Sequence, residues 1–101
     1  MPAVEIPLLK VARQSMSVVM DNNEWGISLW WQPNDRNWYI SVSNVNDDMI
    51  VTGRRMVSQE KVLPDRYRVN LWCELIPGAE TNVLGENPWG ETHRLIARWP
   101  D

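Results

Sequence analysis

Apolar and polar residues alternate one by one along the first half of the chain. This period of two is typical of β-strands that bury one face, because successive side chains of a strand point to opposite sides. It predicts strands at residues 14–20, 25–32, 38–43 and 49–57. Turns rich in Asn and Asp separate them, since these residues tolerate the backbone angles of tight turns. The first half therefore predicts a meander of antiparallel strands with short connections.

Two features interrupt this pattern. Gly53 stands inside the fourth predicted strand, where a glycine typically marks a bulge or the close approach of another backbone. Residues 58–63 have the pattern of a helical turn, which Pro64 would end. We therefore expect an irregular fourth strand followed by a short helical turn.

The second half of the chain predicts fewer strands and longer loops. Residues 67–76 alternate and predict a strand that ends at Pro77 and Gly78, because both residue types favour turns. Residues 94–99 predict a short final strand. Between them, residues 79–92 contain several Gly and Pro and predict an ordered loop.

Together these segments predict an all-β, mainly antiparallel fold, either a small β-sandwich or a partly open β-barrel with long C-terminal loops. A chain of 101 residues fits one domain, so we expect a single β domain over residues 1–101. The apolar positions of the strands predict its core, which comprises Met16, Val18, Ile27, Leu29, Trp38, Ile40, Val42, Val51, Leu71 and Leu95.

Residues 1–13 form a separate N-terminal segment. Val4, Ile6 and Leu8 alternate with Glu5, Pro7 and Leu9, which is an imperfect strand pattern. Because Pro7 lacks the N–H that a central strand needs, the segment predicts an edge strand or an arm that adds to a neighbouring subunit. The sequence leaves these two alternatives open.

Tryptophan dominates the aromatic residues, with seven Trp and two Tyr but no Phe, and five Met accompany them. Trp, Met and Arg are enriched at protein interfaces, and Trp is also common in cores. We therefore expect a protein that binds other proteins and further copies of itself, with each Trp open to either role. The candidate interface residues are Ile6, Leu8, Trp30, Tyr39, Arg54, Arg55, Trp72 and Trp89.

The chain is mildly acidic, with a formal net charge of -3 and a pI near 5.1. Binding to nucleic acid or to an anionic membrane requires a basic surface, so neither is expected as a partner. The N-terminus lacks the apolar run of a signal peptide, and the single cysteine, Cys73, forms no internal disulfide. We therefore expect synthesis in a cytoplasm of bacterial type.

Residues that carry catalysis or bind metals are sparse. His93 is the only histidine, and with Cys73 it supplies too few ligands for a structural zinc site. Residues 58–61 match the S-x-x-K pattern of serine acyl enzymes, but the partner motifs of that chemistry are missing. Acidic turns at residues 34–35 and 47–48 lack the glycine and the distant glutamate of a calcium loop. The sequence therefore predicts no enzyme activity, no cofactor and no metal.

Aromatic residues on β domains also bind sugars by stacking on them. Trp30, Tyr39 and Trp72 are the residues that such a site would use. A carbohydrate-binding module therefore stands as the alternative to a protein-binding role. It requires rings that lie coplanar on one exposed face.

An ordered set of landmarks along the chain resembles a known family. In sequence order they are residues 6–8 (IPL), Gln14, the strand 25–31, residues 38–42 (WYISV), the turn at 46–47, residues 50–57 (IVTGRRMV) and the final strand 94–99. Their order and spacing are similar to those of the short baseplate plug proteins of contractile-tailed bacteriophages. The resemblance covers most of the chain and is strongest over residues 6–57.

This resemblance implies a structural virion protein at the distal end of a phage tail, which is present in the host cytoplasm during assembly. Its implied partners are other baseplate, tube, hub or tape-measure proteins. The resemblance implies no cofactor and no reaction.

Overall fold

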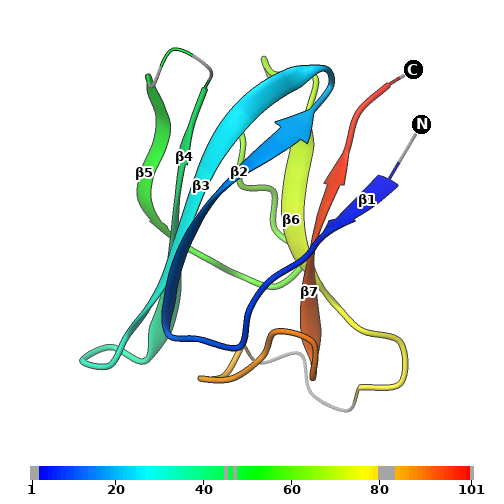
Figure 1. The fold of residues 1–101 in the computed structure, drawn as a ribbon. Helices are drawn as coiled ribbons and strands as arrows, with labels where there is room; N and C mark the ends of the chain where they lie inside the picture. The colour runs from blue at the N-terminus through cyan, green and yellow to red at the C-terminus, as the bar shows by residue number, and fades with distance from the viewer. Residues whose placement is uncertain (1–2, 45, 47, 80–83, 101) are drawn as a thin grey trace.

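The structure is a computed structural model that describes residues 3–44, 46, 48–79 and 84–100, and in these residues seven strands form two antiparallel sheets. The strands are β1 (Ala3–Ile6), β2 (Arg13–Met20), β3 (Asn23–Gln32), β4 (Asn37–Ser43), β5 (Met49–Arg55), β6 (Asn70–Leu75) and β7 (His93–Arg98). One sheet has the order β2-β3-β4-β5 and the other β1-β7-β6 (Figure 1). The prediction of an all-β antiparallel fold is confirmed. Because no strand pairing joins the two sheets in the described part, the sandwich fits the fold and a closed barrel does not.

A two-residue turn joins β2 to β3 and sets the register of the four-stranded sheet. Asp21 and Asn22 both have positive φ angles, 53° and 64°, as the turn that matches the natural twist of a hairpin requires. The register that follows places Arg13 opposite Trp30. Because the turn uses only these two residues, β3 already begins at Asn23, earlier than predicted.

The predicted irregularity at Gly53 is confirmed as a β-bulge. Between two regular pairings of β4 with β5, Ser41 faces both Thr52 and Gly53. Gly53 has a φ of 55°, and its N–H donates a hydrogen bond to Ser41 Oγ over 2.9 Å. Glycine accepts this left-handed conformation without the steric cost that a Cβ atom brings. β5 ends at Arg55, before the predicted end of the strand at residue 57.

Residues 58–63 run along the edge of β6 and do not form the helical turn that we expected, so that prediction is wrong. Gln59 has a φ of 72°, which lies outside the right-handed helical region. Its N–H donates to the carbonyl of Cys73 over 2.8 Å, and the N–H of Val62 donates to the carbonyl of Leu71 over 2.8 Å. Partners distant in the sequence thus decide the conformation of this segment.

The strands of the second half lie close to their predicted positions. β6 begins at Asn70 rather than at residue 67, and β7 begins at His93. The loop between them is ordered near its end by Pro88, whose carbonyl accepts hydrogen bonds of 2.9 to 3.1 Å from the N–H groups that follow it. Residues 80–83 of the predicted loop lie outside the described residues.

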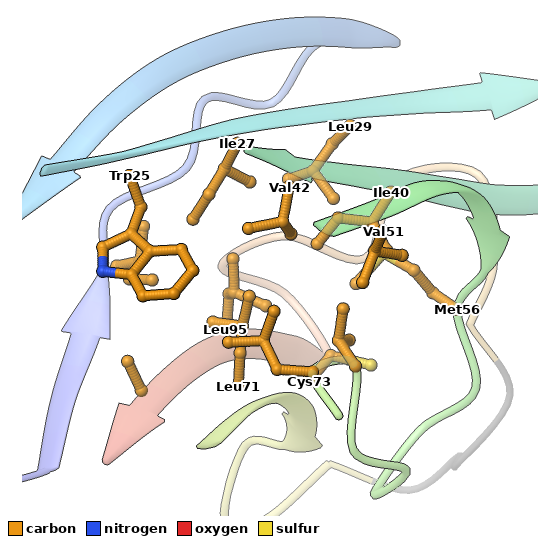
Figure 2. Packing of buried hydrophobic residues seen from close by; sticks show 14 of the residues in the cluster. Trp25, Ile27, Leu29, Ile40, Val42, Val51, Met56, Leu71, Cys73 and Leu95 are labelled. Atoms are coloured by element: carbon orange, nitrogen blue, oxygen red, sulfur yellow. The ribbon is translucent and has the colours of Figure 1, made fainter. Parts of the chain in front are cut away.

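The core lies between the two sheets. Figure 2 shows side chains from β3, β4 and β5 on one side of the core and those of Leu71, Cys73 and Leu95 on the other. The predicted core residues that are buried are Ile27, Leu29, Trp38, Ile40, Val42, Val51, Leu71 and Leu95. Met16 and Val18 are only partly buried and pack against the margin of the core, because they belong to the edge strand β2.

β1 is an edge strand of the three-stranded sheet and pairs with β7 (Figure 1). Its last residue, Ile6, is buried in the core, whereas Val4 is exposed. In this structure residues 3–6 of the N-terminal segment therefore pair with the chain's own sheet.

Candidate functional site

One row of side chains crosses the outer face of the four-stranded sheet, on the side away from the core. Arg13 of β2 pairs with Trp30 of β3. Tyr39 of β4 pairs with Trp30 on one side and with Arg55 of β5 on the other. Directly opposite residues of neighbouring strands share a face, and the strand neighbour of Trp30, Leu29, is fully buried on the inner face. Arg13, Trp30, Tyr39 and Arg55 are called the aromatic–basic row below.

Three members of the aromatic–basic row, Arg13, Trp30 and Tyr39, contact one another in sequence across the sheet. The rings of Trp30 and Tyr39 stack with their centroids 6.1 Å apart and their planes inclined by 19°. The guanidinium carbon of Arg13 lies 5.9 Å from the centroid of the Trp30 ring, within the range of a cation–π interaction. The row therefore presents a continuous strip of aromatic surface with an arginine at each end.

Tyr39 is held by Asp35, which precedes β4. The Tyr39 hydroxyl donates a hydrogen bond to the Asp35 carboxylate, and this bond is the main reason that the pKa of Tyr39 is raised above its ordinary value. Desolvation and the negative charge of Asp35 raise it further, against a lowering by Arg55. The two side chains also line a hollow of about 310 Å³ with Trp30 and Gly53. Tyr39 thus offers a neutral phenol at neutral pH.

Small residues occupy the outer face beside the row. They leave a shallow groove of about 420 Å³, whose lining includes Ser15, Ser17, Gly26, Ser28, Ser41 and Ser43. Ser43 packs closely against Gly26, since a Cβ atom at Gly26 would lie 2.6 Å from Ser43 Oγ. Met16, Ile27 and Met49 also line the groove. Between them, the small side chains let another surface approach this part of the sheet closely.

Two other candidate interface residues on the surface lie outside the row. Arg54 donates to the carbonyl of Val62 over 3.0 Å and to the carboxylate of Glu60 over 2.8 Å. Trp72 belongs to β6 in the other sheet, where the guanidinium carbon of Arg98 lies 5.8 Å from its ring centroid. The structure therefore brings three of the predicted residues together and leaves these two apart.

The remaining candidates belong to the core or its margin. Ile6 and Trp89 are each only 2% exposed. The Trp89 ring packs edge-on against Trp38, with centroids 5.3 Å apart, while Leu8 is partly buried against the core. In this conformation Ile6 and Trp89 stabilise the sandwich and present no side chain to a partner.

Arg13 is the member of the row that sequence reasoning missed. It lies just before the first predicted strand, and no motif marks it. The signal that identifies it is the tight turn at Asp21 and Asn22, because a two-residue hairpin loop determines which residues of the two strands face each other. Counting back from that turn places Arg13 opposite Trp30.

The residues that sequence reasoning considered for catalysis are buried or paired. Burial raises the pKa of the Cys73 thiol to about 11, so the thiol stays protonated and unreactive at neutral pH. His93 is fully buried, with Nδ1 2.7 Å from the Thr92 hydroxyl. Lys61 of the S-x-x-K match pairs with Asp65 over 2.8 Å.

Metal-binding clusters and membrane-spanning helices are absent from the residues that the structure describes. No group of His, Cys, Asp or Glu side chains in the described ranges is arranged to hold a metal ion. The same ranges contain no helix long and apolar enough to cross a bilayer.

The carbohydrate-binding alternative finds no support in the positions of the three suspected rings. Trp30 and Tyr39 stack on each other, while Trp72 lies on the other sheet. These three rings therefore do not form one coplanar platform on a single face.

Comparison with known proteins identifies a family. The model of the family described as "Cyanophage baseplate Pam3 plug gp18" matches residues 3–95. This range includes the first six strands, the beginning of β7 and all four members of the aromatic–basic row. No curated protein sequence matches the chain.

Proposed function

The chain belongs to the phage baseplate plug family, and from this premise we propose that it acts by docking its aromatic–basic row against a neighbouring protein of the tail. The family match confirms the resemblance inferred from the order of the sequence landmarks. A baseplate plug is a structural part of the virion tail, so membership of the family points to a role without catalysis.

The proposed partners are other baseplate, tube, hub or tape-measure proteins, together with further copies of this chain. We take residues 1–101 as one β domain that is present in the host cytoplasm during assembly and is then retained in the tail. The proposal involves no nucleic acid, no membrane and no cofactor.

The observation that supports this docking surface is the composition of the aromatic–basic row. Trp, Tyr and Arg are the residue types that most often dominate binding energy at protein interfaces. Here Trp30 and Tyr39 lie at the centre of the strip, with Arg13 and Arg55 at its ends. The rings are only partly buried in the free chain, so docking would remove the remaining apolar surface from water. The two arginines favour a partner with carboxylates at matching positions.

The test replaces the natural chain by variants in assembling tails. We expect Trp30→Ala to reduce the number of copies retained per purified tail, because loss of a central interface Trp costs about 2 kcal/mol or more, roughly a 30-fold loss of affinity. Quantitative mass spectrometry of purified tails measures retention, and circular dichroism checks that the variant is folded.

Trp72→Ala is the matched control, since Trp72 is also a partly buried surface Trp but lies on the other sheet. We expect it to be retained like the natural chain. Full retention of a folded Trp30→Ala variant, or selective loss of Trp72→Ala, would show that the row is not the docking surface.

A further inference from the structure

Three of the four sheet edges are protected against pairing with another strand. β1 has only four residues, and Pro7 follows it directly. β5 carries the bulge at Gly53 and ends in Arg54 and Arg55. β6 is covered by the segment 58–63, which hydrogen-bonds to its backbone. Short strands, bulges, charges, prolines and covering loops are the usual means by which proteins block edge pairing.

The fourth edge, β2, has none of these protections. Its sequence, RQSMSVVM, spans eight residues, contains no proline and carries a charge only at Arg13. Its pairing with β3 is regular from Arg13 to Met20. In the described part of the chain, no residue outside β3 hydrogen-bonds to the backbone of this strand. A long, regular and nearly uncharged edge is a template for another strand.

The register of the hairpin shows which backbone groups of β2 remain open. The N–H of Trp31 donates to the carbonyl of Ala12 over 2.8 Å. Since antiparallel strands alternate between hydrogen-bonded and non-hydrogen-bonded pairs, the even-numbered residues of β2 turn their backbone groups toward β3. The N–H and C=O groups that point to the open edge are those of Arg13, Ser15, Ser17 and Val19.

Apolar side chains at this edge are incompletely covered. Met16 and Val18 on the inner face pack against the core but remain only partly buried. On the outer face Val19 is 68% exposed. A strand added beside β2 would cover these side chains as well as the open backbone groups.

We propose that the occupant of this edge is β2 of a second copy, paired antiparallel about a twofold axis at Ser17. In this register the open backbone groups of Ser17 face those of the second Ser17, and Ser15 faces Val19. Met16 faces Val18 on the inner face, so the core continues across the interface. A symmetric, self-complementary contact of this kind is typical of homodimers.

Charge complementarity favours this register and a second copy over an unrelated strand. The twofold axis at Ser17 places Arg13 of each copy opposite Asp21 of the other. Asp21 is the turn residue that directly follows β2, and its carboxylate already pairs with one cation, Arg68, at 3.3 Å. The inference rests on the proposed role in assembly and adds the edge through which two copies meet; it does not depend on which protein covers the aromatic–basic row.

Cysteine cross-linking tests the register directly. In a hydrogen-bonded antiparallel pair the Cα atoms lie about 5.5 Å apart, within the range of about 4.4 to 6.8 Å that a disulfide spans. We therefore expect purified Ser17→Cys to form a covalent dimer under mild oxidation. Val19→Cys is the matched control, because the two copies of residue 19 would lie roughly 13 Å apart. The natural Cys73 is buried, so the natural chain gives the background level of cross-linking.

Removal of a single N–H tests the edge. Ser17→Pro deletes a donor that points away from β3, and an edge strand tolerates this loss. We expect the dissociation constant of the dimer to rise about 10- to 100-fold, because two hydrogen bonds are lost at the twofold axis. Ser17→Thr keeps the donor and should associate like the natural chain. Analytical ultracentrifugation measures association, and circular dichroism checks folding.

Several results would overturn the inference: a monomer at all concentrations, equal cross-linking of Ser17→Cys and Val19→Cys, or a dimer that Ser17→Pro leaves unchanged. The proposed function is tested separately, by measuring the retention of the natural chain in tails. A monomeric chain that is still retained would refute only the pairing of β2.

Discussion

The two faces of the four-stranded sheet are built from the same strands but carry opposite kinds of side chain. On the inner face, Ile27 and Ile40 are at most 1% exposed. On the outer face, the adjacent positions hold serines and the partly buried rings of Trp30 and Tyr39. Because successive residues of a strand alternate between faces, this sheet separates the core from the proposed docking surface residue by residue. Substitutions one position apart should therefore affect different properties.

The largest effect on stability is expected on the inner face. Ile40→Ala removes a fully buried side chain from the middle of the core and should lower the free energy of unfolding by about 2–5 kcal/mol. Ser28→Ala on the outer face is the control; it removes only an exposed hydrogen bond between the Ser28 and Ser15 hydroxyls, 2.9 Å long, with an expected change of less than about 1 kcal/mol. Urea denaturation followed by Trp fluorescence measures both. Equal losses in the two variants would mean that the faces are not separated in this way.

A smaller loss of stability is expected from a substitution at Gly53, in the backbone beside the aromatic–basic row. Gly53→Ala places a Cβ atom in a residue with a φ of 55°, while the nearest side-chain atom, Cζ2 of Trp30, is 3.9 Å away. There is room for the methyl group, so the cost is conformational strain of about 1–2 kcal/mol. Gly85→Ala is the matched control, because its φ is not positive and no atom of the described residues lies within 4 Å of the position that its Cβ would take. Thermal denaturation should show a lower midpoint for Gly53→Ala alone.

A still smaller stability change is expected for the centre of the row. Trp30→Ala removes the stacking with Tyr39, which contributes about 0.5–1.5 kcal/mol beyond the burial of the rings, and the Trp30 ring is only partly buried. The loss of stability should therefore be below that of Ile40→Ala, although tryptophan is the larger side chain. Denaturation midpoints compare the two variants directly. A cost as large as that of Ile40→Ala would indicate that Trp30 serves mainly to hold the fold.

The smallest effect concerns the ionisation of Tyr39. Its raised pKa means that the folded chain holds the phenolic proton more tightly, so this contribution to stability is present below the ordinary tyrosine pKa and is lost as the pH rises through the folded value. Asp35→Asn removes the charge of the acceptor and should lower the pKa of Tyr39. Ultraviolet titration of tyrosinate in a Tyr67→Phe background follows Tyr39 alone. An unchanged titration curve would show that Asp35 does not control this group.

Sequence reasoning was most successful where the fold depends on local alternation. The positions of Ile27, Leu29 and Ile40 on the buried face follow directly from a period of two. It failed at residues 58–63, because hydrogen bonds to the distant strand β6 determine that segment. The pairing of β1 with β7 likewise joins segments near the two ends of the chain, and no local sequence pattern predicts it.

The candidate site was predictable in part for the same reason. Composition alone selected Trp30, Tyr39 and Arg55, which the strand register then places in one row. Composition could not tell these residues from Ile6 and Trp89, which are equally apolar or aromatic but are buried by the topology of the second sheet and its loops. Strand register, rather than residue type, was the missing information.

The most direct test of the central claim is a cryo-electron microscopy reconstruction of the assembled tail tip that contains this chain. We predict that a neighbouring protein covers the outer face of the four-stranded sheet, with Trp30 and Tyr39 at the centre of the contact and Arg13 and Arg55 at its rim. A reconstruction in which this face is open to solvent, while the chain is held through other surfaces, would contradict it.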